Sequence, residues 1–394
     1  MRPGRPSADG GTPLLAALRD KRILVVGGAG GVGKTTVAAA LALRAALDGR
    51  RVLVCTIDPS RRLATSLGLD RLPDRPRALG LARLGPRPGG SLMAMTLDTK
   101  RTFDDLVERH MPSAEARRRV LENRLYKNVS SALAGSHEYM ATEKLLELSA
   151  DARFDLVVLD TPPTRHALDF LEAPERLMGF LDTSVLRYFL KPYFVAGRLT
   201  LKVATRTGAL ALKLADRFLG LQFLQDLSEF FLAFEGMYDG FKARAAQVHD
   251  LLRGPASGFV VVTGPAPGAM DEARYFHGRL EESRMPFVAF VVNRVHPDPA
   301  SAPRAEGGRT LPVGSGLAEA LVGIVRDEQR VARRERRTIA RLAADTVEPL
   351  VVVPEQEGDV HDLRGLEAVG TSLVAAPKRS AARRAQRRVA RSRA

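Results

Sequence analysis

The stretch ILVVGGAGGVGKTT, residues 23–36, joins an apolar run to a glycine-rich turn and then to a segment rich in alanine and leucine. The apolar run at residues 23–26 predicts a buried parallel strand, and residues 34–47 predict a helix that ends at Gly49. The turn between them fits the pattern G-x-x-x-x-G-K-[ST], in the strand–turn–helix context that the pattern requires. A chance glycine-rich turn is the alternative, but it rarely meets both conditions. The stretch therefore predicts a phosphate-binding loop.

The residue types of this loop explain how it is expected to hold a nucleotide. Glycines allow backbone conformations that a Cβ forbids, so several N–H groups can converge on phosphate oxygens at the positive end of a helix. We expect the Lys34 ammonium to reach the β- and γ-phosphates and the Thr35 hydroxyl to bind Mg²⁺. The predicted ATP-binding residues of the loop are Gly28, Gly30, Gly31, Val32, Gly33, Lys34, Thr35 and Thr36.

Two acids at strand ends are candidates for the chemistry. Asp160 ends an apolar strand predicted at residues 154–160, where a carboxylate can hold the Mg²⁺ shell; a strand-end capping acid is the alternative. Asp58 ends a strand predicted at residues 51–58 and can position the attacking water. An aspartate that starts a turn before Pro59 is the alternative for that residue.

Asn293 ends a further apolar strand, predicted at residues 287–293. Its amide offers both a donor and an acceptor, which suits an adenine edge, although a structural asparagine fits the spacing equally well. The guanine-reading motif Asn-Lys-x-Asp is not present, because Arg294 follows Asn293. The sequence therefore favours ATP over GTP.

The remainder of the chain alternates predicted strands and helices, which predicts an α/β fold with a doubly wound, mainly parallel sheet. One stretch lacks a strand signal and is rich in aromatic residues, so we expect an inserted helical subdomain. The Pro-, Gly- and Arg-rich residues 72–90 predict a loop. The expected organisation is a flexible segment at 1–20, a P-loop ATPase domain at 21–376 with helical parts at about 100–150 and 174–252, and a basic disordered tail at 377–394.

The composition of the chain bears on its cellular location and on possible disulfides. The chain of 394 residues carries a net charge of +15 and a single cysteine, so a disulfide framework is excluded. Neither a long uncharged apolar segment nor a secretory signal is evident, so the cytoplasm is expected, with peripheral membrane attachment as a variant. Residues 377–394 hold eight basic residues and no acid. Such a tail is a solvated arm or a contact for anionic membrane or nucleic acid.

Several motifs together resemble the arsenical-pump-type ATPases, which include the ATPases that target tail-anchored membrane proteins. The resemblance covers about residues 21–375, as in a bacterial single-length member. It implies that Asp58 activates water, that Asn293 and Pro354 flank adenine, and that the insertion builds a hydrophobic client site. The motifs that carry it are the P-loop, Asp58-Pro59, Asp160-Thr161-Pro162-Pro163-Thr164, Val291-Val292-Asn293-Arg294 and Val353-Pro354-Glu355.

The chain also departs from this family. The family's P-loop usually carries a lysine at the position of Ala29, and that lysine reaches the partner's nucleotide across a dimer. An in-trans cation of this kind can be worth about 10³–10⁵ in rate. The resemblance therefore implies a dimer. The absence of the lysine implies either a heterodimer with a lysine-bearing paralogue, or slow or differently arranged catalysis. Cys55 is alone, which fits core packing better than metalloid binding, and the zinc-bridging CxxC of eukaryotic tail-anchored targeting factors is missing.

The expected function is a Mg-ATP-hydrolysing switch that couples its nucleotide state to an apolar client or a membrane protein. An ordinary helical core is the alternative reading of the aromatic-rich insertion. Two other functions stay open: a positioning ATPase that uses its basic tail on membrane or nucleoid, and an energising subunit of an anion transporter.

Overall fold

The computed structural model divides the chain into two compact units, one formed by residues 1–96, 151–167 and 252–394 and the other by residues 97–150 and 168–251. The residues that the structure describes are 12–58, 60–85, 87, 89–110, 113–122, 136–162, 238–299 and 314–375.

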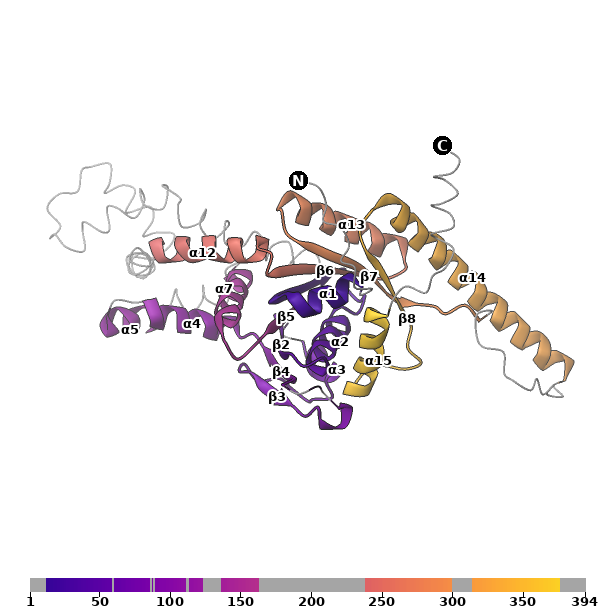
Figure 1. The fold of residues 1–394 in the computed structure, drawn as a ribbon, viewed down its shortest axis with the longest axis horizontal. Helices are drawn as coiled ribbons and strands as arrows, with labels where there is room; N and C mark the ends of the chain where they lie inside the picture. The colour runs from indigo at the N-terminus through magenta and orange to yellow at the C-terminus, as the bar shows by residue number, and fades with distance from the viewer. Residues whose placement is uncertain are drawn as a thin grey trace, which may run out of the picture. The chain divides into compact units, whose positions relative to one another are not determined.

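The first unit is built on an eight-stranded sheet with the order β3-β4-β2-β5-β1-β6-β7-β8 (Figure 1). All neighbours pair in parallel except β3 and β4, which are antiparallel. This confirms the predicted α/β fold with a mainly parallel sheet. The strands are β1 (Ile23–Gly28), β2 (Arg51–Thr56), β3 (Arg77–Leu79), β4 (Ser91–Thr96), β5 (Leu156–Asp160), β6 (Ser257–Thr263), β7 (Phe287–Val295) and β8 (Leu350–Pro354).

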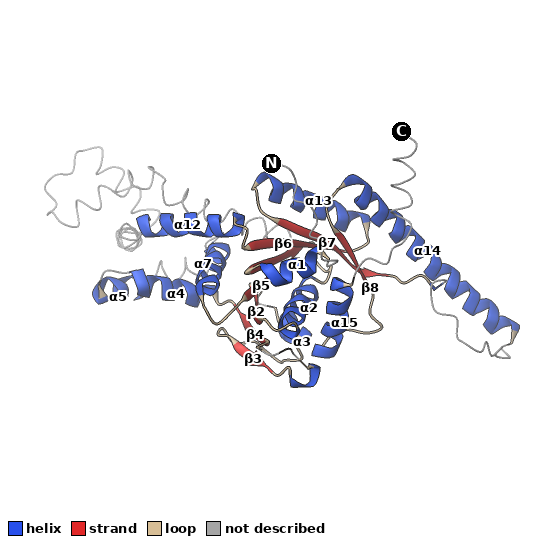
Figure 2. Cartoon of the chain, in the orientation of Figure 1, coloured by secondary structure: helices blue, strands red, loops and turns tan. Residues whose placement is uncertain are grey.

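Helices cover this sheet, as the blue ribbons around the red strands show (Figure 2). Parallel sheets are covered on both faces, which explains why β1 and β6 are apolar runs that are buried along their whole length. The helical elements of this unit are α1 (Pro13–Asp20), α2 (Lys34–Leu47), α3 (Arg62–Ser66), η1 (Ala82–Leu84), α13 (Pro267–Glu282), α14 (Ser315–Asp345) and α15 (Leu363–Val374).

Small side chains allow α2 to be buried almost all round. Its alanines bring the neighbouring backbone close, and α15 packs on it at Gly370, where an added Cβ would lie 3.1 Å from the Ala40 carbonyl oxygen. Helix α15 thus packs closely on the middle of α2, the helix that begins directly after the loop that follows β1. The central place of β1, between β5 and β6, puts that loop in the middle of the sheet edge.

Two sequence expectations need correction. Residues 13–20, expected within a flexible segment, form helix α1: the Thr12 hydroxyl accepts from the Leu15 N–H, and Leu14 and Leu18 are buried in the core. Residues 72–90, expected as a loop, include the edge strand β3 and the short helix η1. The expected basic tail at 377–394 and residues 1–11 lie outside the described residues.

The second unit is helical in its described part, which consists of α4 (Thr99–His110), α5 (Ala114–Glu122), α7 (Ser136–Ala150) and most of α12 (Tyr238–Arg253). Arg244 of α12 pairs with Glu143 of α7, whose side chain is 4% exposed, and this buried charge pair fastens the two helices. Of the expected insertion at 174–252, only the part from residue 238 onward is described. Within the described ranges, no helix combines the length and apolarity that a bilayer span needs.

Candidate functional site

The phosphate-binding loop connects β1 to α2 and requires glycine at two positions in particular. Gly28 has φ 147°, and an added Cβ would lie 1.9 Å from the Val262 carbonyl oxygen of β6. Gly33 has φ 87°, and an added Cβ would lie 2.3 Å from Nδ2 of Asn293. Both residues adopt backbone conformations that side chains rarely tolerate, so the loop is shaped by close approach of β6 and β7.

The end of β7 braces this loop from the side. Nδ2 of Asn293 donates to the Val32 carbonyl oxygen at 2.9 Å, and the asparagine is only 6% exposed. Arg294 has φ 56° and extends its guanidinium to within 3.4 Å of the Gly31 carbonyl oxygen. The NH₂ group of the Asn293 side chain therefore already donates one hydrogen bond to the loop itself. The sequence shows Arg294 only as part of a motif, and its contact with the loop was not predicted.

Lys34 opens α2 and is 7% exposed. Its Nζ donates to the Ala29 carbonyl oxygen at 2.7 Å, so the ammonium lies folded over the loop. Burial lowers the pKa of Lys34, although the Asp160 carboxylate acts in the opposite direction. A buried ammonium with one carbonyl partner gains strongly from an incoming anion, as a phosphate-binding lysine should.

Asp160, at the end of β5, lies opposite this lysine and is completely buried. Its Oδ2 accepts hydroxyl hydrogen bonds from Thr35 and Thr56, each at 2.9 Å, and its Oδ1 is buried without a hydrogen-bond partner among the residues that the structure describes. Burial raises the pKa of Asp160 to about 6, against the hydroxyls of Thr35 and Thr56, which favour the charged form. Thr56 is a second site residue that we did not single out from the sequence.

The residues around Asp160 fit a hydrated Mg²⁺. A hydroxyl and a carboxylate are hard oxygen ligands of the kind that Mg²⁺ takes, usually with several waters retained. Oδ1 of Asp160 can accept a hydrogen bond, but no donor lies within reach among the described residues. A magnesium-bound water would supply that donor. Thr35 and Asp160 are thus brought together as the sequence predicts.

Asp58 follows β2 and lies at the same end of the sheet. Its N–H donates to the Thr56 hydroxyl at 3.1 Å, and its Oδ1 accepts from the Ser60 N–H at 2.8 Å. Its Oδ2 lies 3.7 Å from the Arg62 guanidinium. The aspartate is therefore half-buried and oriented by its own loop rather than by Lys34.

The remaining residues considered in the sequence lie on several elements of the first unit. Ala29 is buried, at 5% exposure, and Cys55 is fully buried in β2. Gly30 is exposed at the rim, and Thr36 is half-buried in the first turn of α2. Pro354 ends β8, and its carbonyl oxygen accepts from the Gln356 side chain at 2.9 Å.

The family model for anion-transporting ATPases matches residues 21–306. The chain belongs to this family. Its members are ATPases, and the fold and the loop geometry agree with that assignment.

The chain also resembles individual proteins, at low sequence identity. The chain is 26% identical over 308 residues to the ATPase GET3C of Arabidopsis thaliana, covering 73% of this chain and 70% of that protein. It is 29% identical over 183 residues to the ATPase GET3 of Rhodotorula glutinis, covering 45% of this chain and 50% of the relative. A candidate arsenical pump-driving ATPase of Halobacterium salinarum is 30% identical over 181 residues, 45% of this chain and 28% of that protein. Beyond the first relative, these similarities span half or less of the proteins compared.

Proposed function

We propose that this chain binds Mg-ATP at the loop between β1 and α2, hydrolyses it, and uses the cycle to control binding of an apolar client or a membrane partner. The single observation that carries the proposal is the buried arrangement of Lys34, Thr35 and Asp160, with Thr35 and Asp160 joined at 2.9 Å and one carboxylate oxygen unpartnered. The family assignment supports ATP as the nucleotide.

In this proposal, backbone and side-chain groups of the chain position the phosphates of ATP. Backbone N–H groups of the loop and the start of α2 bind phosphate oxygens. Lys34 exchanges the Ala29 carbonyl for the β- and γ-phosphates, and Asn293 keeps the loop in place through Val32. Thr35 and Asp160 would hold Mg²⁺, which would supply positive charge to offset the negative charge that develops during phosphoryl transfer. Asn293 and Pro354 flank the adenine.

Asp58 is the proposed group that positions the attacking water. To do so its carboxylate leaves the Ser60 N–H and the Arg62 guanidinium. Arg62 is 66% exposed and 3.7 Å away, so this ion pair contributes little and is no strong barrier to the rearrangement. A change in the loop after β2 is therefore part of the proposed cycle.

The proposed assembly is a dimer, and specifically a heterodimer with a paralogue that supplies a lysine. Ala29 carries no charge and is packed at 5% exposure, so this chain offers no cation from that position. A partner lysine beside the phosphates would supply what an arginine finger supplies in other P-loop enzymes.

The decisive experiment measures Mg-ATPase turnover of the purified chain alone, with ATP binding in parallel. Lys34→Ala is the test variant, and Lys100→Ala, at an exposed lysine paired with Asp104, is the matched control. Tight binding with negligible turnover supports the heterodimer. Turnover that depends on Lys34 retains the ATPase proposal and removes the need for a paralogue. No ATP binding by the wild-type chain overturns the proposal.

Client binding has its own test. Hydrophobic C-terminal segments immobilised on beads are incubated with the chain in the presence of ATP or of no nucleotide. ATP-dependent retention supports an apolar client. Equal retention on beads that carry a polar segment removes the client from the proposal and leaves the ATPase.

A further inference from the structure

His296 lies between two glutamates that come from different elements. Its Nδ1 lies 2.8 Å from Oε1 of Glu335 in α14, and its backbone N–H donates to Oε2 of the same carboxylate at 2.9 Å. Its Nε2 lies 3.2 Å from Oε2 of Glu355, just after β8. We call this group the His296 clamp.

The geometry requires a charged imidazole. Both ring nitrogens face carboxylate oxygens, and only the imidazolium donates from both nitrogens at once. Burial alone lowers the pKa of His296, but the hydrogen bond to Glu335 and the charges of Glu335, Glu355 and Glu328 outweigh it and raise the pKa above 6.5. The nearby Arg336 is itself neutralised by Asp298 at 2.7 Å.

The clamp holds the two strand ends that border the nucleotide loop. His296 continues directly from Asn293 and Arg294, which contact the loop carbonyls of Val32 and Gly31. On the other side, the Glu355 N–H donates to the Val295 carbonyl oxygen at 3.0 Å, immediately after Pro354. A displacement of His296 is therefore transmitted to the brace of the loop within a few bonds.

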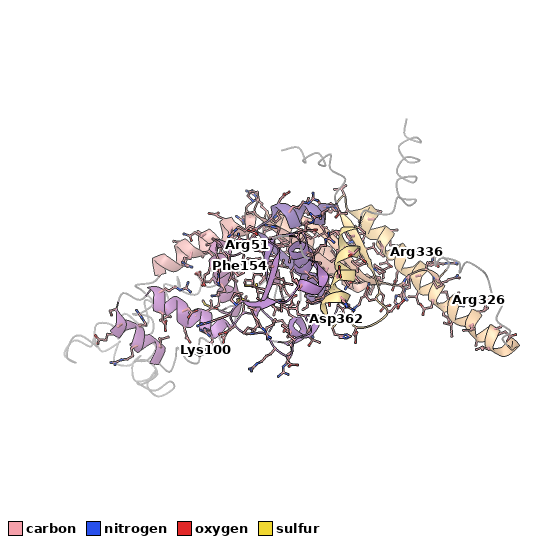
Figure 3. The ribbon with its side chains drawn as sticks, turned by 60° about the horizontal axis from the view of Figure 1, so that its bottom comes forward. Arg51, Lys100, Phe154, Arg326, Arg336 and Asp362 are labelled. Carbon is pink, nitrogen blue, oxygen red and sulfur yellow. The ribbon has the colours of Figure 1, made fainter. Side chains whose placement is uncertain are left out.

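The clamp is also where helix α14 is fastened. The second half of α14 is attached to the unit: Glu335 by His296, Arg336 by Asp298 and Asp345 by Arg274. Its first half leaves large apolar side chains exposed, with Leu317 at 55% and Ile324 at 59%. Figure 3 labels Arg326 and Arg336 along this helix.

We propose that Glu335 and His296 are positioning residues that couple attachment of α14 to nucleotide affinity, a proposal that rests on the ATP site proposed above. Attachment of α14 through the clamp keeps Asn293 and Arg294 on the loop, which favours bound nucleotide. Because coupling is reciprocal, bound nucleotide favours attachment of α14. Loss of the proton from His296, as the pH rises through its raised pKa, weakens both the attachment of α14 and the binding of nucleotide.

The test uses the full chain with Glu335→Gln, and Glu319→Gln as the matched control on the exposed first turns of α14. Affinity for a fluorescent ATP analogue is measured at about pH 6 and about pH 8.5, which bracket the neutral range in which histidine titrates. Titration of the nucleotide and of Asp160 is common to both variants and cancels in their comparison. Trypsin cleavage at the arginines of α14 is followed in parallel, both without nucleotide and with the ATP analogue present.

The expected result is that Glu335→Gln binds about five-fold more weakly than Glu319→Gln at the lower pH, with a smaller difference at the higher pH. Cleavage of α14 should be faster in Glu335→Gln, and nucleotide should slow it in the control. Faster cleavage with unchanged affinity overturns the coupling and leaves the ATP site intact. If Glu335→Gln and Glu319→Gln are cleaved at the same rate and bind nucleotide equally, the proposed role of the His296 clamp is refuted. No binding by either variant or by the wild type defeats the ATP site itself, and the cleavage data then judge the clamp alone.

Discussion

Thr56→Val tests how hydroxyl hydrogen bonds stabilise the buried Asp160 carboxylate in the absence of ligand. The substitution keeps the shape of a side chain that is 2% exposed and removes the hydroxyl that donates to Asp160 at 2.9 Å. The same hydroxyl accepts from the Asp58 N–H at 3.1 Å, and loss of that neutral hydrogen bond contributes equally at low and at high pH. The pKa of Asp160 is about 6 in the folded chain against an ordinary 3.8, so ionisation costs the fold about 3 kcal/mol at about 1.36 kcal/mol per pH unit. The Asp160 contribution to stability is complete below 3.8 and is lost as the pH rises through 6.

Removing one of the two hydroxyls makes the ionised carboxylate still less favourable. Hydrogen bonds to charged groups contribute about 1.5–3 kcal/mol, and neutral ones about 0.5–1.5 kcal/mol. Thr56→Val should therefore lower the free energy of unfolding by about 1.5–3 kcal/mol at pH 8 and by less at pH 5. The measurement is urea unfolding followed by circular dichroism, without nucleotide and with a chelator.

The control for this prediction is Thr263→Val, at another fully buried strand-end threonine, whose hydroxyl bonds to the adjacent Gly264 carbonyl at 3.2 Å. It should show no comparable dependence on pH. An effect of Thr56→Val that is equal at both pH values, or no larger than that of the control, would refute the account of Asp160.

Three further outcomes are expected. Gly33→Ala should abolish binding of a fluorescent ATP analogue, because its Cβ would lie 2.3 Å from Asn293; a folded variant with wild-type affinity would contradict the loop geometry. Arg244→Ala should destabilise the helical unit by about 3–5 kcal/mol in thermal unfolding, because it leaves the buried Glu143 unpaired, and a loss under 1 kcal/mol would count against that pair. Deleting residues 377–394 should leave turnover unchanged and reduce co-sedimentation with phosphatidylserine vesicles, at about 1 kcal/mol per basic residue; unaltered sedimentation would exclude the tail as a membrane contact.

The sequence predicts those parts of the site that are formed by residues close together in the chain. The loop and Lys34 follow from a contiguous pattern, and Asp160 follows from the end of a recognisable strand. Thr56 could not be found in this way, because it reaches Asp160 only through the parallel pairing of β2 with β5, in which these two residues are register partners. That pairing joins segments about a hundred residues apart.

The His296 clamp was missed for the same reason, since it unites three elements that are separate in the chain. Helix α1 was missed for a different one. Thr12 and Pro13 are favourable start signals, yet a segment of eight residues is marginal as an isolated helix. Burial of Leu14 and Leu18 against the sheet stabilises it, and that contact has no local signature.

The strand order has a consequence for the chain during its synthesis. β1 is made early, but its neighbours β5 and β6 come much later, and the brace of its loop, Asn293, comes later still. At about 5–20 residues per second, roughly 13–50 s separate Gly28 from Asn293 on the ribosome. Until β5 and β6 have been made, the nascent chain carries an apolar strand with open edges, and the loop lacks its brace until Asn293 follows. Assembly of the nucleotide site is thus among the last events of folding, and a truncated product should expose β1 without being able to bind ATP.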